Sequence, residues 1–396
     1  TAEAAAERGY ALTLVTADTG VVLSPGIHLG ATDTITLAAH GDVDGASAAD
    51  GSASQGADAT IGAAVALTSA TVRTLAVVPA GVSIEASGLT LRADTTAAGD
   101  GTSTFGARSV AGAGGGKVSV AGSVAIAAIT HTVRAAIEGS VALSGASGDA
   151  SITAASRLSS TVSALPAGAG VTSTGDLGFG ASVALNLITD KTFAEVGDGG
   201  VLTGARNLTL SVTAVDAATT EARMGAAGGK VALTPAVAVT LSNVTTRTRI
   251  GSGALALSGA LAATAAQKAS ATTSATAGAY GATSAGIGVA LALTITNHTV
   301  TTELARSVTA ASVALSASSI SVSASSAAAS AAGAPEETGS GAGSGPSGVT
   351  SQVEGERTHA SATSSAHGGD GAGSATTPEP ESSSGKVNVA AAIAIT

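Results

Sequence analysis

The sequence lacks several residue types on which ordinary globular domains depend. Its 396 residues contain no Cys, no Trp, one Met, three Phe and two Tyr, although 44% of them are hydrophobic. Without Cys, disulfide bonds and thiolate metal sites are excluded. Aromatic and Met side chains normally fill the irregular gaps of a core. A core built from Ala, Val, Leu and Ile therefore favours short units that repeat and stack on one another.

Charge is also scarce, and it is acidic. Only 11% of the residues are charged, and the formal net charge is −10. Basic residues do not cluster, so we expect no nucleic-acid partner. No stretch approaches the roughly 18 apolar residues of a membrane helix, so we expect a chain that does not span the membrane. The N-terminus lacks the basic region of a signal peptide and is interpreted as the start of a fragment or of a processed chain.

One pattern of residues recurs through the chain. The segment "SVAIAAITHTVRAAI" aligns without gaps to three later segments, whose starts lie 182 − 123 = 59, 236 − 182 = 54 and 290 − 236 = 54 residues apart. A Lys-Val pair lies just upstream of two of these copies, and the same pair appears again near the C-terminus. The last eleven residues therefore open a further unit. The full copies span 123–137, 182–196, 236–250 and 290–304, with a shortened copy at 63–75 and Lys-Val pairs at 117, 230 and 386.

Each unit predicts one long strand, two short strands, a stretch rich in Ser, Thr and Ala, and a Gly-rich turn. Alternation of large and small residues at period two is typical of strands. Stacking of such units predicts an all-β fold, a repetitive β-solenoid or β-helix with units of about 54–59 residues. An array of β-sandwiches is the alternative. Because Ala is the best helix former, residues 1–8 and 324–334 also fit helices.

The alternation also predicts which side chains are buried. Val118, Val120, Val124 and Ile126 share one face of the first strand, and we expect this face in the core. The equivalent Leu185 and Val239 should then be buried as well.

Some repeat positions accept chemically different residues. His131 is replaced by Asp190 and Val244 in other copies, and Arg134 by Phe193. Such tolerance indicates solvent-facing positions, so substitutions at His131 and Arg134 should be nearly silent.

The repeats divide the chain into eight segments, one of which is an insertion. Residues 333–385 are rich in Gly, Ser, Pro and acidic residues, and they replace the turn of the fifth unit. Because insertions are tolerated in exposed turns, the turns at 112–116, 166–176, 225–229 and 278–286 should share one edge. The expected segments are 1–60 (a partial first unit), 61–116, 117–176, 177–229, 230–283, 284–332, the insert 333–385, and 386–396 (the first strand of the next unit).

The repeat resembles that of a known group of proteins. Units of the form V-A-x-N-x-x-T-x-x-T-x-A-x-I-x-x-G, best seen in "SVALNLITDKTFAEVGDGGVLTGARNLTLSVTA" (182–214), are similar to repeats of very large bacterial surface adhesins, including filamentous-haemagglutinin-like exoproteins. The resemblance covers roughly 60–325 and the last eleven residues. It implies secretion, an elongated shape and an extracellular location at a bacterial cell surface. It supplies no catalytic residue.

No motif in the sequence points to an enzyme or a bound cofactor. "GAGGGKVS" (112–119) has Ala111 and Val118 where a phosphate-binding loop needs Gly and Ser or Thr. The six His residues lack metal-ligand spacing. Asp42 and Asp44 form the best pair of carboxylates on a turn, so they are weak calcium candidates, with an ordinary polar turn as the favoured interpretation.

We expect a structural module of an extracellular fibre, stalk or sheath that associates end to end. The partners would be copies of itself or flanking repeats of the same giant chain. The alternative is an adhesin module that binds a receptor or a cell-surface glycan through the insert 333–385. The C-terminal strand should abut the N-terminus of the next copy, adding to its sheet edge. The expected assembly residues are Lys386, Val387, Val389, Ile393, Ile395, Thr396 and Thr1.

Overall fold

The computed structural model describes residues 4–54, 56–144, 148–333 and 387–396. All regular secondary structure in these ranges is β-strand, so the all-β prediction is confirmed. The helical alternative is wrong where it can be checked, because residues 4–8 and 324–333 belong to strands. The strands form parallel sheets of consecutive units, an arrangement compatible with a β-solenoid.

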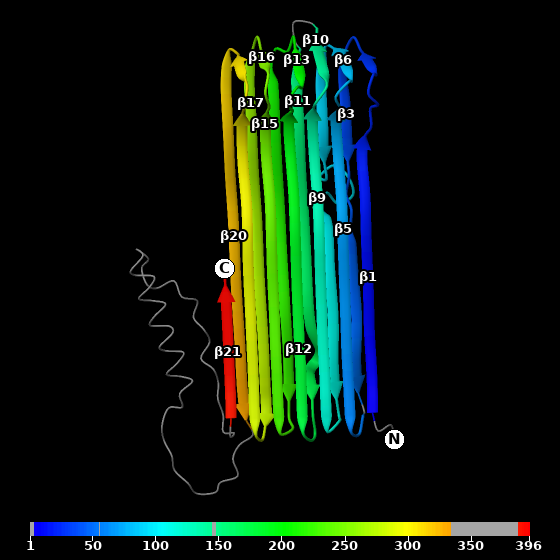
Figure 1. The fold of residues 1–396 in the computed structure, drawn as a ribbon, viewed down its shortest axis with the longest axis vertical. Helices are drawn as coiled ribbons and strands as arrows, with labels where there is room; N and C mark the ends of the chain where they lie inside the picture. Colours follow the sequence, from blue (N-terminus) through cyan, green and yellow to red (C-terminus); the bar gives the residue numbers. More distant parts are fainter. Residues whose placement is uncertain (1–3, 55, 145–147, 334–386) are drawn as a thin grey trace, which may run out of the picture.

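The long first strands of successive units lie side by side in a parallel sheet, named here the forward sheet (Figure 1). Ser123 pairs with Ser182, Ser182 with Ala236, and Ala236 with Ala290. The predicted in-register stacking is therefore confirmed. In spatial order the described strands are β1 (Ala4–Val21), β5 (Ala59–Val78), β9 (Val118–Ile137), β12 (Leu177–Val196), β15 (Val231–Ile250), β18 (Ala285–Leu304) and β21 (Val387–Ile395).

A second parallel sheet, the return sheet, contains the Ser/Thr/Ala-rich stretches. Sequence analysis gave these stretches no secondary structure, yet from the third unit onward each continues from the preceding short hydrophobic segment as one long strand. In the first two units the return strand is split in two. Its members are β3 (Thr34–His40), β4 (Gly45–Ser54), β7 (Gly88–Asp94), β8 (Ser103–Gly114), β11 (Ala150–Thr172), β14 (Leu208–Ala227), β17 (Ala260–Ala282) and β20 (Ser312–Gly333).

The two ends of the long strands are connected differently. Short strands join the sheets at one end, the short-strand end; they are β2 (His28–Gly30), β6 (Ser83–Ala86), β10 (Ser140–Leu143), β13 (Val201–Thr203), β16 (Ala254–Ala256) and β19 (Ser307–Thr309). Tight turns close the opposite end, the turn end (Figure 1). Gly228 and Gly229 there have φ of 80° and 79°, which favours glycine. The Lys230 N–H donates to the Gly175 carbonyl of the preceding turn, so the prediction of a shared edge is confirmed.

The outermost described strands extend the two sheets on both sides. Residues 4–54, within the range expected as a partial first unit, supply β1 to β4, which are the same kinds of strand found in later units. At the other side, β21 pairs with β18 and sets Ala392 beside Ala290. Apart from Gly333, the insert 333–385 lies outside the described residues.

The space between the two long sheets widens from the turn end to the short-strand end. On the forward strands, one inward row consists of Ala66, Ala125, Ala184, Ala238 and Ala292, each 0% exposed. Toward the short-strand end the buried residues are larger. They include Ile84, Leu89, Leu91, Ile137, Ile152, Leu208, Leu210 and Leu261. Small side chains predominate where the sheets are close, and larger branched ones fill the wider part.

Candidate functional site: an apolar outer face and a buried polar cluster

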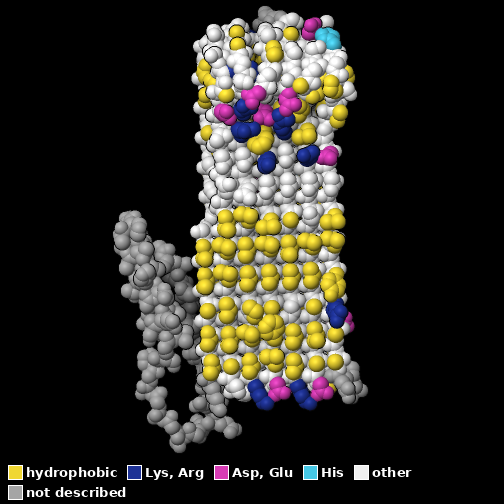
Figure 2. Space-filling view, in the orientation of Figure 1, with side chains coloured by type: hydrophobic (Ala, Val, Ile, Leu, Met, Phe, Trp, Pro, Cys, Tyr) yellow, Lys and Arg dark blue, Asp and Glu magenta, His cyan; other side chains and the backbone are white. Residues whose placement is uncertain are grey.

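The outer surface of the forward sheet carries rows of large apolar side chains. Figure 2 shows these rows over the half of the molecule nearer the turn end. They are continuous because the register between strands is unbroken. Individual side chains are well exposed, with Ile61 at 46%, Val183 at 38% and Ile295 at 48%. Three rows, read from β5 to β18, are Ile61, Val120, Phe179, Leu233, Ile287; Val65, Val124, Val183, Val237, Leu291; and Leu67, Ile126, Leu185, Val239, Leu293.

These rows overturn the predicted face of the first strand. Val118, Val120, Val124 and Ile126 point outward and are only partly buried, whereas the small residues between them are buried. Leu185 and Val239 likewise point outward. The physical reason is the short distance between the two sheets at this end, where most inward positions of the forward strands hold Gly, Ala, Ser or Thr. The unbroken row of inward Ala residues was the sequence signal that could have identified the narrow side.

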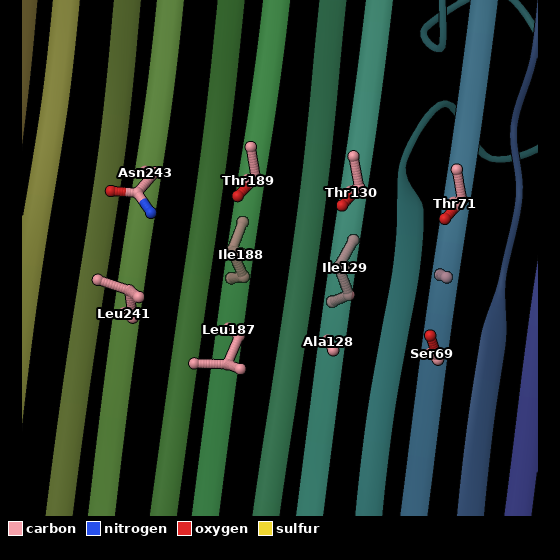
Figure 3. A pocket seen from close by; sticks show the side chains of 11 residues that line it. Ser69, Thr71, Ala128, Ile129, Thr130, Leu187, Ile188, Thr189, Leu241 and Asn243 are labelled. Carbon is pink, nitrogen blue, oxygen red and sulfur yellow. The ribbon is translucent and has the colours of Figure 1, made fainter.

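The side chains of the next outward row differ in length (Figure 3). Ser69 and Ala128 have short side chains, while Leu187 and Leu241 in the same row project further. A shallow hollow of about 190 Å³ lies here, bounded on one side by Thr71, Thr130, Thr189 and Asn243. It holds no charged side chain among its lining residues.

The outer surface of the return sheet differs from that of the forward sheet. Its outward positions are mostly hydroxyl-bearing, and they also form rows across the strands. Thr161, Thr219 and Thr272 form one such exposed row. The molecule therefore presents one largely apolar and one hydroxylated face.

Ion pairs border the apolar rows toward the short-strand end. Arg134 Nε donates to Glu195 Oε1 at 2.6 Å, and Arg247 Nη2 donates to Glu195 Oε2 at 3.2 Å. The Arg247 guanidinium also lies over the Phe193 ring, 4.8 Å from its centroid. Arg134 makes a further bond to Glu138 Oε1 at 2.5 Å. Arg134 lies on the outer face, as expected, with its side chain 26% exposed. Because it pairs with Glu195, whose side chain is only 6% exposed, its tolerance to substitution stays a prediction.

A cluster of polar side chains lies buried between the sheets. His131 Nδ1 is 2.7 Å from Asp190 Oδ1, and Ser156 Oγ donates to Asp190 Oδ2 at 2.9 Å. His131 and Asp190 are both 0% exposed. Asp216 is buried beside Asp190, and burial, with the Asp190 charge second, raises its pKa well above the usual value. His131 and Asp190 are therefore not the solvent-facing residues that the repeat comparison predicted.

The chemistry of this cluster is that of a structural network. Ser156 Oγ and Asp190 Oδ1 both contact the same imidazole nitrogen, Nδ1 of His131. A Ser-His-Asp relay needs the two partners on opposite ring nitrogens. The cluster instead satisfies the carboxylate of Asp190, whereas His131 Nε2 has no hydrogen-bond partner among the described residues. Farther along the core a threonine ladder pairs buried hydroxyls, with Thr240 Oγ1 2.7 Å from Thr273 Oγ1.

The calcium candidates Asp42 and Asp44 lie where the first return strand is interrupted. Asp42 Oδ2 accepts from the backbone N–H of Asp100 at 2.9 Å and of Gly101 at 3.2 Å. Asp44 Oδ1 accepts from the Thr104 N–H at 2.7 Å. Burial raises the pKa of Asp42, with the Asp44 charge adding to this effect. Within the described ranges no three His, Asp or Glu side chains come close enough to hold a metal ion. Calcium binding stays a prediction.

The expected assembly residues lie at one side of the forward sheet. Val387, Val389, Ile393 and Ile395 belong to β21, which is the outermost described strand and lies at the opposite side from β1. Thr396 is exposed. Lys386 and Thr1 lie outside the described residues.

The described part of the chain contains no helix long and apolar enough to cross a membrane. No protein family, no curated protein and no solved structure matches this chain.

Proposed function

We propose that this chain is a structural repeat module of a β-solenoid that forms a fibre, stalk or sheath at a bacterial cell surface. One observation carries the proposal: every long strand of the forward sheet pairs with its neighbour in unbroken register, from β1 to β21. A unit of this kind cannot bury its inner face alone and needs a neighbour on each side. The resemblance to filamentous-haemagglutinin-like repeats supports the extracellular location.

The outermost units support continued stacking along the solenoid axis. Val313 and Leu315 on β20 occupy the inward positions beside the buried Leu261 and Ala263. They are nevertheless 50% and 45% exposed, because no described strand covers them. A further unit in register would bury them, whether it belongs to the same chain or to another copy. The same stacking pairs the open backbone edge of an outer strand, which is otherwise prone to aggregation.

Fibre diffraction and electron microscopy of the purified chain test this proposal. End-to-end stacking predicts filaments with a repeat of about 4.8 Å along the filament axis, since strands lie perpendicular to it. Leu315→Asp should abolish filaments by placing a charge in the stacking surface, while Ala314→Asp on the outward side of the same strand should not. Single particles at all concentrations, or filaments unaffected by Leu315→Asp, would show that the chain does not stack in this way.

The alternative, an adhesin module that binds a receptor or glycan through the insert 333–385, has one observation in its favour. β18 and β21 pair without a shift in register although the insert separates β20 from β21 in the sequence. The insert can therefore vary without disturbing the sheets. Deleting residues 334–385 separates the two functions: an adhesive role would be lost with the insert, whereas filament formation would survive.

A further inference from the structure

The apolar face of the forward sheet is larger and more uniform than stacking along the solenoid axis requires. Six outward positions on each of β5, β9, β12, β15 and β18 carry no charged side chain, and Ser69 is the only polar one. These positions run from Ala59 to Ser69 on β5 and from Ala285 to Ile295 on β18. Soluble monomers rarely expose contiguous apolar patches of more than a few hundred Å².

We propose that this face docks against the same face of a second copy of the chain. The four strands β5, β9, β12 and β15, about 4.8 Å apart, and six rows about 6.7 Å apart give a flat area of roughly 770 Å² per copy. A specific protein interface of standard size buries about 800 Å² per partner. The area of these four strands is thus close to that of a standard interface.

The shape of the face suits pairing with itself. In the uneven row, the short Ser69 and Ala128 lie on β5 and β9, and the longer Leu187 and Leu241 lie on β12 and β15. A two-fold axis parallel to the strands, midway between β9 and β12, sets Ala128 opposite Leu187 and Ser69 opposite Leu241. The projecting leucines of one copy then enter the hollow of the other. Two-fold pairing of one patch with itself is the commonest symmetry of protein assemblies.

The rest of the surface supports a buried forward face. The return sheet presents hydroxyl groups, such as those of Thr161, Thr219 and Thr272, which water hydrates well. The charged side chains of Arg134, Glu195 and Arg247 border the apolar rows at one end, as the polar rim of an interface does. Two copies joined through their apolar faces would bury these rows and leave both return sheets facing solvent.

Sedimentation velocity of the full chain tests the pairing. Leu185 lies near the centre of the face, so Leu185→Lys should shift the dissociation constant of the pair upward by at least 100-fold. Thr219→Lys, on the hydroxylated face, is the matched control and should leave the pair intact. Far-UV circular dichroism confirms that each variant is folded. End-to-end stacking does not involve Leu185, so loss of face pairing and loss of stacking are distinguished.

Chemical cross-linking gives a second readout that does not depend on a charged variant. The chain contains no Cys, so Val183→Cys introduces a single thiol at the centre of the face. Packed sheets lie about 10 Å apart, a distance that a short bismaleimide spans. Val183→Cys should give a covalent dimer, whereas Thr219→Cys should not.

Four results would overturn the proposal. They are a wild-type chain that shows no face-dependent association, equal cross-linking at both cysteine positions, pairing that appears only after residues 334–386 are deleted, and a monomer that binds phosphatidylcholine vesicles through Leu185. The third result would mean that the insert covers the face, and the fourth that lipid does.

Discussion

Two glycines on neighbouring strands allow a direct test of how closely the sheets approach each other. Gly62 on β5 points inward, and Gly122 on β9 points outward. They sit one position apart in the paired register, since Gly62 lies beside Ala121 and Gly122 beside Ala63. Neither has a positive φ. The same substitution to Ala therefore differs only in the direction of the added methyl group.

The structure gives opposite expectations for the two variants. A Cβ on Gly62 would overlap the Gly112 carbonyl oxygen and lie 2.5 Å from that of Gly51, both on the return sheet. The sheets must separate to accept it, which costs about 3 kcal/mol, the upper end of overpacking penalties. A Cβ on Gly122 meets no atom within 4 Å. Gly122→Ala should instead stabilise the strand by roughly 0.5–1 kcal/mol.

Urea denaturation followed by far-UV circular dichroism measures the difference. Because the chain has no Trp, intrinsic fluorescence is a poor probe. At a typical slope of about 2 kcal/mol per molar urea, a loss of about 3 kcal/mol lowers the midpoint by about 1.5 M. Equal midpoints for Gly62→Ala and Gly122→Ala would refute the narrow core, and with it the outward direction of the apolar rows.

Three further predictions concern the buried polar groups. His131→Asp places a carboxylate beside the buried Asp190 and should lower stability by several kcal/mol in thermal unfolding; a silent change would show that the position is hydrated. Burial raises the pKa of Asp216, so the folded chain keeps a proton that the unfolded chain loses above about pH 4. Stability should therefore fall as the pH rises from that value toward the folded pKa, and Asp216→Asn should raise the unfolding temperature at pH 7 but not at pH 3; an equal shift at both pH values would contradict the titration. Arg306 is 8% exposed and donates to the carbonyls of Gly197, Gly200 and Gly251, so Arg306→Met should cost about 3 kcal/mol in urea unfolding, while Arg223→Met on the surface should cost less than about 0.5 kcal/mol.

The repeat organisation of the forward sheet was predictable from the sequence. Gap-free alignment of the segments that start at Ser123, Ser182, Ala236 and Ala290 predicted the observed register. The Gly-rich turns marked one end of the long strands, and the Lys-Val pair placed β21 beside β18 across the insert. These features could be predicted because in-register parallel stacking places equivalent residues of successive units beside one another.

The return strands were harder to predict from the sequence. Their Ser, Thr and Ala residues alternate with small side chains on both faces, as in 150–172. Such a stretch has no strong difference in hydrophobicity between its two faces, so period two leaves little signal. Pairing with neighbouring units makes it a strand, and that contact exists only in the folded chain.

Tertiary structure alone decided which face of each long strand points into the core. The two-residue alternation of a strand shows that Val124 and Ala125 point to opposite sides, but it does not show which side is the core. General hydrophobicity selects Val124, whereas the distance between the two sheets selects Ala125. The same contact buries His131 and Asp190, which pair with each other from neighbouring strands. The sequence by itself thus determined the repeat, the strands of the forward sheet and their register. Only the close approach of two sheets determined which side chains are inside, because that choice depends on the space available between them.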